Sequence, residues 1–329
     1  MEFEKIPTIP TADEILDRSL RRAAKNKKLK TNRDLANEDF VRSVYSSVYD
    51  KLSDSVQKFP NFDELSPFYT DIVNLLFSID KIKHSLGAIQ WAGEKVREVG
   101  GAYARQMRGA PDTNALRKQA TARISSIVQQ VDKDLKYLNE ARNVLRKLPD
   151  IRPDEFTVVV AGYPNVGKSS FINLVSSATS EVAGYAFTTK RIIVGHHEVG
   201  RDRIQIVDTP GILDRPVEER NDIEQQALAA ITNVADMILF IVDASECCGY
   251  SLEDQLKLME GIKEITKGVP LEVVINKSDM KGLEGYRNMS TATREGIHDV
   301  VALLREYLAS SPKNLTARNQ PENRDERRR

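Results

Sequence analysis

The stretch Gly162–Ser170, with the sequence GYPNVGKSS, decides the fold of this chain. It follows an apolar run, Phe156–Ala161, that is typical of a buried strand, and it leads into Phe171–Val175, which predicts the start of a helix. A strand, a loop of the pattern G-x-x-x-x-G-K-[ST] and a helix form an arrangement that cradles phosphate groups. Its glycines let backbone N–H groups point inward, and the helix N-terminus adds its positive end.

Two side chains of this loop carry the expected chemistry. We expect Lys168 to reach the β- and γ-phosphates of a nucleotide and the Ser169 hydroxyl to hold Mg²⁺. A loop can match the pattern by accident, so its weight depends on motifs further along the chain. The residues expected around the phosphates are Gly162, Pro164, Asn165, Val166, Gly167, Lys168, Ser169 and Ser170.

A second motif, Asp208–Gly211 with the sequence DTPG, comes after the expected strand Arg203–Val207. A carboxylate at a strand end that faces the phosphate loop can hold the water shell of Mg²⁺, and this is the role predicted for Asp208. The N–H of Gly211 can approach a γ-phosphate because no Cβ blocks the approach.

A third motif, Asn276–Asp279 with the sequence NKSD, comes after the expected strand Leu271–Ile275 and includes Lys277. A carboxylate at Asp279 can accept hydrogen bonds from both N1–H and N2–H of guanine, a donor pair that adenine lacks. The motif therefore predicts GTP rather than ATP. Three motifs in this order, each at a strand end, make an accidental match very improbable.

The chain divides into a helical first half and a second half of alternating strands and helices. No segment with the period of a strand precedes Phe156, so residues 1–152 predict an all-α bundle. Residues 153–310 predict an α/β domain with helices on both faces of a mostly parallel sheet that includes one antiparallel hairpin. Residues 311–329 are polar and predict a disordered tail. The expected strands are Phe156–Ala161, Arg191–His197, Arg203–Val207, Met237–Val242 and Leu271–Ile275, and the last expected helix is Gly296–Ala309.

Local signals predict where the helices of the first half begin and end. Thr11 and Glu14 form a capping box, and Asn37 is a plausible N-cap for a helix that ends near Gln57. The pair Ser66–Pro67 predicts a further start. The expected later helices are 67–86, 89–107 and a long one from Asp112 to Leu148, whose apolar stripe consists of Ile124, Val128, Val131, Leu135, Leu138 and Leu145.

Charge is unevenly spread although the formal net charge is zero. Residues 1–153 contain 27 Lys and Arg against 21 Asp and Glu. The segment Arg18–Arg33 contains eight basic residues and no acidic one. Such a run is commonly a solvated helix face, but its density here favours an arm that contacts the phosphates of nucleic acid, RNA in particular. Phosphate contacts position a protein without reading sequence.

The cysteines and the hydropathy pattern indicate the compartment. The two cysteines, Cys247 and Cys248, are adjacent, and we expect them to be reduced thiols. No apolar run has the length of a membrane span, and no signal-peptide core is apparent. We expect a cytoplasmic protein without membrane contact.

The three motifs together resemble those of the GTPases, and this resemblance implies further site residues. The segment Tyr185–Lys190 is similar to switch I, which makes Thr189 the expected Mg²⁺ ligand beside Ser169 and Asp208, with Thr188 as the alternate. Ser290 and Thr291 resemble the last guanine-contacting loop, although S-T replaces the usual S-A. The residues implied in catalysis are Lys168, Thr189, Gly211 and Asn165.

The resemblance narrows to the Nog subfamily of the Obg-type GTPases, in the short form typical of archaea, and covers the chain to about Leu308. It is carried by the phosphate loop as far as Asn173, Tyr185–Lys190, Asp208–Asp214, Val194–His196, Arg220–Asn221 and Glu246–Gly249. It implies GTP and GDP binding and a role in the assembly of the large ribosomal subunit. The implied partners are the precursor of that subunit, its rRNA and ribosomal proteins, and the protein is expected to be a monomer off the ribosome.

One position bears on turnover. Signalling GTPases place a water-orienting Gln after D-x-x-G, whereas this chain has Ile212, so we expect slow intrinsic hydrolysis. Asn165 occupies the position at which related GTPases bind K⁺, which predicts stimulation by K⁺; activation by the ribosome is the competing idea. Two other functions stay open: a slowly hydrolysing, GTP-bound assembly placeholder, and an Obg-like regulator of the ribosome or of the stress response.

Overall fold

The computed structural model describes residues 3–28, 32–176, 181–184, 191–200, 202–208, 213–214, 230–266 and 268–313. Of residues 181–184, 191 and 192 it describes only the backbone. The chain forms two compact units. The first comprises Met1–Leu65 and Leu76–Arg146, and the second comprises Ser66–Leu75 and Lys147–Arg329.

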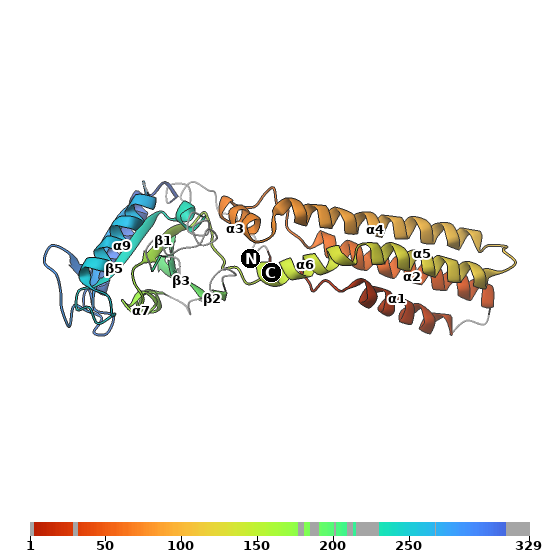
Figure 1. The fold of residues 1–329 in the computed structure, drawn as a ribbon, viewed down its shortest axis with the longest axis horizontal. Helices are drawn as coiled ribbons and strands as arrows, with labels where there is room; N and C mark the ends of the chain where they lie inside the picture. Colours follow the sequence, from red (N-terminus) through yellow and green to blue (C-terminus); the bar gives the residue numbers. More distant parts are fainter. Residues whose placement is uncertain are drawn as a thin grey trace. The chain divides into compact units, whose positions relative to one another are not determined.

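The first unit is a helical bundle, as predicted. Its helices are α1 (Ala12–Lys27), α2 (Arg33–Gln57), α4 (Ile79–Gln106), α5 (Thr113–Gln130) and α6 (Asp132–Leu145). Helices α2, α4 and α5 lie side by side, and α1 packs along α2 (Figure 1). The predicted apolar stripe of α5 and α6 is buried along its whole length.

The start of α1 confirms the predicted capping box, whereas the predicted start of α2 is wrong. Thr11 accepts a hydrogen bond from the backbone N–H of Glu14, and the Glu14 carboxylate accepts one from Thr11 N–H. Helix α2 begins at Arg33 because Asn32, rather than Asn37, caps it by accepting from two backbone N–H groups. Asn37 is fully buried within the helix, where its amide donates to Thr113 Oγ1 at 2.9 Å.

Two helix breaks lie at positions that sequence patterns did not predict. The predicted break near residue 87 is absent, since α4 is continuous there, and the break lies at Ser78, whose φ of 55° and ψ of 113° are incompatible with a helix. The expected long helix from Asp112 begins as predicted, with Asp112 as N-cap, but is interrupted at Val131 (φ −101°, ψ 13°). The break at Val131 separates α5 from α6 without disturbing the apolar stripe.

Helix α3 (Pro67–Phe77) belongs for most of its length to the second unit, although it precedes the phosphate loop by many residues. The Tyr69 hydroxyl donates to the carbonyl of Pro149 at 2.8 Å and accepts from the N–H of Ile151 at 3.0 Å. Phe68 and Ile72 are fully buried. The domain boundaries predicted from the sequence therefore remain a proposal, because the second unit includes a segment from the first half of the chain.

In the part of the second unit that the structure describes, seven strands form one sheet with the order β2-β3-β4-β1-β5-β6-β7. The strands are β1 (Phe156–Ala161), β2 (Glu181–Gly184), β3 (Arg191–Val199), β4 (Asp202–Asp208), β5 (Met237–Asp243), β6 (Leu271–Asn276) and β7 (Arg287–Asn288). Strand β3 runs antiparallel to both β2 and β4, and all other pairs are parallel. The predicted strands and the predicted β3–β4 hairpin are confirmed, while the short strands β2 and β7 were not foreseen.

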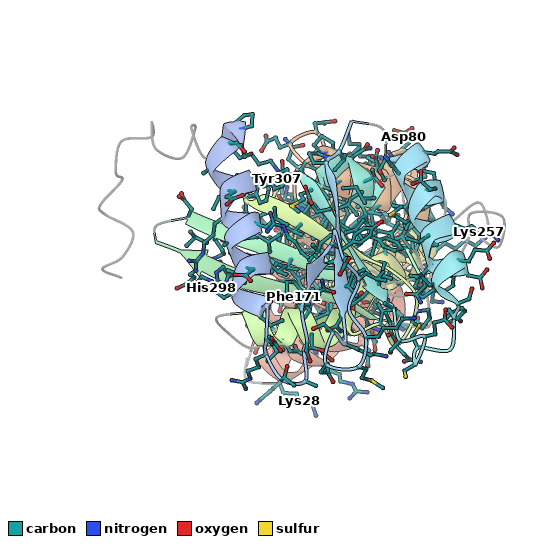
Figure 2. All side chains as sticks on the ribbon, turned by 90° about the vertical axis from the view of Figure 1, so that its left-hand side faces the viewer. Lys28, Asp80, Phe171, Lys257, His298 and Tyr307 are labelled. Carbon is teal, nitrogen blue, oxygen red and sulfur yellow. The ribbon has the colours of Figure 1, made fainter. Side chains whose placement is uncertain are left out.

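Helices cover both faces of this sheet, as expected. Among the described residues these helices are α7 (Lys168–Val175), α9 (Leu252–Ile265) and α10 (Ile297–Ser310). Figure 2 shows α10, marked by His298 and Tyr307, on one side of the strands and α9, marked by Lys257, on the other. Strands β1 and β5 are completely buried between these layers.

The chain is described as far as Lys313, so most of the predicted disordered tail lies outside the described residues. Lys313 Nζ lies 2.6 Å from Asp236 Oδ2, which ties the segment after α10 to the start of β5. None of the helices described is both long and apolar enough to cross a membrane.

Candidate functional site: a nucleotide pocket at the carboxyl ends of the strands

The predicted motifs meet at one edge of the sheet because β1, β4 and β6 are parallel. The register pairs Val160 of β1 with Asp208 at the end of β4, and Asp243 of β5 with Asn276 of β6. Ligands of open α/β sheets bind outside the carboxyl ends of the strands. The topology therefore brings the phosphate loop, Asp208 and the NKSD segment to the same edge.

The phosphate loop has a backbone that needs glycine at its two ends. Gly162 has a φ of 132°, and a Cβ there would lie 2.4 Å from the carbonyl oxygen of Ile241. Gly167 has a φ of 102°, and its Cβ would lie 2.1 Å from Nδ2 of Asn276. Between them, Asn165 adopts a φ of 63° and is exposed. The loop can approach its neighbours and a ligand closely because both end positions lack a side chain.

Lys168 is held inside this loop. Its Nζ donates to the carbonyls of Gly162 at 2.7 Å and Tyr163 at 2.8 Å, and the residue is only 8% exposed. The lysine is the first residue of α7, so its ammonium group and the helix N-terminus place positive charge at the same point. The electrostatics of the loop suit an anion such as a phosphate.

Two predicted Mg²⁺ ligands lie next to each other. The Ser169 hydroxyl donates to Asp208 Oδ2 at 2.6 Å, and Asp208 is fully buried. A hydroxyl and a carboxylate are hard oxygen donors, which Mg²⁺ prefers in phosphate sites. These residues therefore fit the ion. Within the described residues there is no cluster of three or more His, Cys, Asp or Glu that could hold a metal by itself.

Asn276 joins the predicted guanine-reading segment to both neighbouring loops. Its Nδ2 donates to Val166 O at 2.7 Å and to Thr291 Oγ1 at 3.2 Å, and its Oδ1 accepts from Thr291 N at 3.0 Å. Asn276 is completely buried. The site is thus one bonded assembly, in which the phosphate loop, the NKSD segment and the last loop share a side chain.

The remaining predicted guanine contacts differ in their surroundings. Asp279 is exposed at the turn after β6, where its carboxylate is accessible to a base. Thr291 contacts Asn276, whereas the Ser290 hydroxyl is buried and accepts from the backbone N–H of Thr293 at 3.1 Å. The structure therefore joins Thr291 to the site by a side-chain contact and gives Ser290 a role inside its own loop.

Lys277 pairs with a carboxylate that motif analysis did not identify. Its Nζ lies 2.6 Å from Oδ2 of Asp243, which is completely buried at the end of β5. Burial raises the pKa of Asp243, but hydrogen bonds from Lys277 and Ser245 outweigh it and hold that pKa below its usual value. An acidic residue at a strand end next to the NKSD strand was the only sequence signal that could have suggested this pair.

A second unforeseen contact involves the phosphate loop itself. The ring of Tyr163 stacks on that of Tyr250 with centroids 4.0 Å apart and planes inclined by 26°. Tyr163 is buried, while Tyr250 is 38% exposed. The end of β5 therefore contacts the NKSD segment through Asp243, and the loop after it contacts the phosphate loop through Tyr250. The cysteines of the loop between β5 and α9 are free, as predicted, with Cys247 exposed and Cys248 buried.

Three predicted site residues, Thr188, Thr189 and Gly211, lie outside the described residues, as does Ile212. Leu213 is described, and its carbonyl accepts from Gly162 N at 3.2 Å. The roles predicted for Thr188, Thr189 and Gly211 at the Mg²⁺ and γ-phosphate positions stay predictions.

The basic segment of the first unit is largely accessible. Among the described residues of this segment Lys27 is the exception, since its Nζ donates to the buried Asn37 Oδ1 at 2.6 Å. Burial lowers the pKa of Lys27, and the charges of Arg117 and Arg33 lower it further. Arg21 forms an exposed ion pair with Asp17. The basic side chains of the segment that are described as exposed are Arg18, Arg21, Arg22, Lys25, Lys28 and Arg33.

Comparisons with known proteins match the two halves of the chain to two different family models. Residues 3–152 match the family model described as NOG1 N-terminal helical domain. Residues 157–277 match the family model described as 50S ribosome-binding GTPase.

Relatives of similar sequence extend over both halves. The protein MJ1408 of Methanocaldococcus jannaschii is 43% identical over 289 residues, which cover 84% of this chain and 81% of that protein. Nucleolar GTP-binding protein 1 of Drosophila melanogaster is 39% identical over 288 residues, covering 84% of this chain and 44% of the relative. The Arabidopsis thaliana protein of the same name is 34% identical over 310 residues, covering 91% of this chain and 46% of the relative. The chain thus spans most of the first relative and less than half of the other two.

Proposed function

Since the chain belongs to the nucleolar GTP-binding protein 1 (Nog) subfamily of the Obg-type GTPases, we propose that it is a Mg²⁺-dependent GTP switch in the assembly of the large ribosomal subunit. The proposed nucleotide binding rests on one observation: Asn276 is hydrogen-bonded both to the phosphate loop and to Thr291 at the carboxyl edge of the sheet.

In this proposal the phosphates lie in the loop from Gly162 to Ser170. They accept hydrogen bonds from its backbone N–H groups and pair with the ammonium group of Lys168. The ammonium group now bonded to two loop carbonyls would turn to the β- and γ-phosphates. The base would lie against the NKSD segment, where Asp279 accepts from guanine and Asn276 holds the turn in place.

Mg²⁺ would be held by Ser169, Asp208 and Thr189, with Thr188 as the alternate ligand. Bound there, the ion would neutralise charge on the β- and γ-phosphates. The two ligands described share a hydrogen bond of 2.6 Å, so the chain already brings their oxygens together. Thr189 and the N–H of Gly211 would then sense the γ-phosphate, which gives the protein its two states.

Hydrolysis of GTP to GDP and phosphate should be slow without a partner, because Ile212 cannot orient water. Asn165, exposed with a φ of 63°, is the residue we expect to contact K⁺. Single-turnover hydrolysis measured in KCl and in NaCl tests this, with faster turnover expected in KCl. Equal rates would remove K⁺ from the proposal and favour activation by the ribosome.

The first unit would contact rRNA through the exposed basic side chains of α1 and the segment after it. Each Lys or Arg that neutralises a phosphate adds close to one unit to the slope of log K against log salt. We expect Lys25→Ala with Lys28→Ala to lower that slope by about two for binding to pre-ribosomal RNA. The matched control is Lys95→Ala with Lys136→Ala, two lysines of the same unit that pair with Glu98 and Asp132.

Two measurements distinguish a GTP switch from the placeholder and the Obg-like regulator: nucleotide binding, and release of the protein from ribosomal particles. Purified protein should bind GTP more tightly than ATP in the presence of Mg²⁺, and Asp279→Asn should reduce that preference. Lys168→Ala and Thr189→Ala should leave binding to ribosomal particles intact and prevent release. Release that does not depend on these residues would favour the placeholder. Nucleotide-dependent binding to mature subunits would favour the Obg-like regulator. Location in the cytoplasm and a monomeric state off the ribosome stay predictions.

A further inference from the structure

Strand β5 ends in a carboxylate, Asp243, that lies at the centre of a dense network of hydrogen bonds. Asp243 Oδ1 accepts from Ser245 N at 3.0 Å and from Ser245 Oγ at 2.5 Å. Its Oδ2 accepts from Cys248 N at 2.8 Å and from Lys277 Nζ at 2.6 Å. The residue is completely buried. A buried charge with four donors around it has a fixed position.

The backbone of Asp243 is fixed as well. The side-chain amide of Gln255, 1% exposed on α9, accepts from Asp243 N at 2.8 Å and donates to Asp243 O at 3.0 Å. Both the main chain and the side chain of Asp243 are therefore anchored to the sheet and to α9. Asp243 can therefore act as a fixed anchor for a side chain from another loop.

The group tied to it is Lys277, which lies at the corner of the guanine-reading turn. Lys277 has a φ of 57°, in the left-handed region that lysine rarely adopts. Its carbonyl accepts from the N–H groups of Met280 at 2.9 Å and Lys281 at 3.1 Å, which closes the turn that carries Asp279. Such a backbone conformation persists only where the surroundings hold it. The tie from Nζ to Asp243 is one such constraint, and Asp279 is two residues further along.

We propose that Asp243 is a positioning residue for guanine recognition, which acts through Lys277 to hold the turn that presents Asp279 to the base. This inference rests on the proposed GTP-binding function and assigns part of its base specificity to a residue outside the three motifs. Asp243 itself touches no nucleotide; it sets where the reading carboxylate lies. Loss of the tie lets Lys277 leave its left-handed conformation, and Asp279 then loses its alignment with N1–H and N2–H.

The other end of the same strand supplies a matched control. Asp236, directly before β5, also pairs with a lysine at 2.6 Å, Lys313, and also accepts from a backbone N–H at 2.8 Å, that of Thr157. It lies at the amino end of β5, away from the nucleotide edge. Asp236→Asn therefore removes a comparable pair without reaching the guanine-reading turn.

The test compares GTP with inosine triphosphate, which has the same phosphates and N1–H but lacks the N2 amino group. We measure the Kd of both nucleotides with Mg²⁺ for the full chain, Asp243→Asn and Asp236→Asn, together with the melting temperature of each. The wild-type protein is expected to prefer GTP, and Asp243→Asn to lower the ratio of the two affinities at least fivefold. Asp236→Asn is expected to lower the melting temperature and leave the ratio unchanged.

Each outcome has a definite meaning. An unchanged ratio in folded Asp243→Asn, or an equal fall in Asp236→Asn, would overturn the inference, because either result assigns Asp243 to general stability. If Asp243→Asn does not fold, Ser245→Ala removes one donor to the same carboxylate and should lower the ratio in the same direction, with an unchanged ratio counting against the inference. A wild-type protein that does not bind GTP would instead refute the proposed function itself.

Discussion

Asn276 donates a hydrogen bond of 2.7 Å to the backbone carbonyl of Val166, so the NKSD segment is bonded directly to the phosphate loop. Both groups are buried, and water cannot replace either partner. The NKSD segment and the phosphate loop are therefore joined by a buried hydrogen bond, and we expect mutations at their junction to affect the proposed binding of both base and phosphates.

The junction can be tested at Asn276 itself. Asn276→Ala leaves the carbonyl of Val166 and the N–H of Thr291 without their partner, and each such loss costs about 1–3 kcal/mol. We expect a lower free energy of unfolding in urea and weaker GTP binding. Asn288→Ala is the control, because the Asn288 amide also makes hydrogen bonds but is exposed. Equal losses in the two variants would contradict the assignment.

Alanine substitutions at Gly167 and at Gly249 distinguish the effect of a steric contact from the effect of backbone strain. Both have φ values near the left-handed region, 102° and 92°, so alanine is strained at either position. Only at Gly167 would the new Cβ meet a neighbour, Asn276 Nδ2, at 2.1 Å. Gly249→Ala should cost about 1–2 kcal/mol of unfolding free energy, and Gly167→Ala should cost more and reduce GTP affinity. Calorimetric titration with GTP measures the second effect, and normal binding by Gly167→Ala would rule out the contact.

The Tyr163–Tyr250 stack should stabilise the phosphate loop. Aromatic pairs contribute about 0.5–1.5 kcal/mol beyond the area they bury, so Tyr250→Leu should lower stability by about that amount. Hydrogen exchange at the backbone amides of the loop should become faster in this variant. Tyr286→Leu, at an exposed tyrosine of the same unit, should not change that exchange. Unaltered exchange in Tyr250→Leu would show that the loop holds its shape without the stack.

Glu38 should make the first unit sensitive to acid. The hydrogen bond from Arg42 lowers the pKa of Glu38, burial opposes this, and Arg108 lowers it further. Because the folded pKa lies below the unfolded value of about 4.3, the unfolded state binds more protons as the pH falls. The stabilisation is present above that pH and is lost as pH falls through the folded pKa.

Urea denaturation of the wild-type protein and Glu38→Gln, from about pH 7 down to pH 3, measures this loss. The difference in stability between them should shrink towards the acid end. Glu98→Gln, at an exposed residue that pairs with Lys95, should show little difference at any pH. A wild-type advantage over Glu38→Gln that persists at the lowest pH would refute the linkage.

Sequence patterns predicted five of the strands of the second unit, because these are short apolar runs and three of them, β1, β4 and β6, lead directly into a motif. They were less successful with α2. Asn32 and Asn37 are both good N-caps locally, and the choice between them depends on partners far along the chain. Asn37 is required inside the bundle by Lys27 of α1 and Thr113 of α5, contacts that no local pattern contains.

The motif residues of the site could be predicted for the same reason as the strands, since parallel topology brings strand ends together. Asp243 and Tyr250 could not. Asp243 meets Lys277 34 positions further along, and nothing in the sequence around either residue specifies that pairing. Tyr250 contacts Tyr163 from a loop that carries none of the three motifs. Side chains that support a motif from another loop become visible only when the fold is known.

Helix α3 has a consequence for how the protein is made. Its apolar residues Phe68 and Ile72 belong to the second unit, whose sheet is translated later. The hydroxyl of Tyr69 forms its hydrogen bonds with Pro149 and Ile151, which also come later in the chain. During synthesis from the N-terminus the hydrogen bonds of Tyr69 cannot form until residues 149–151 have been translated. A nucleotide-binding half excised at residue 152 would lack the helix altogether, and we expect it to aggregate unless residues 66–75 are supplied separately.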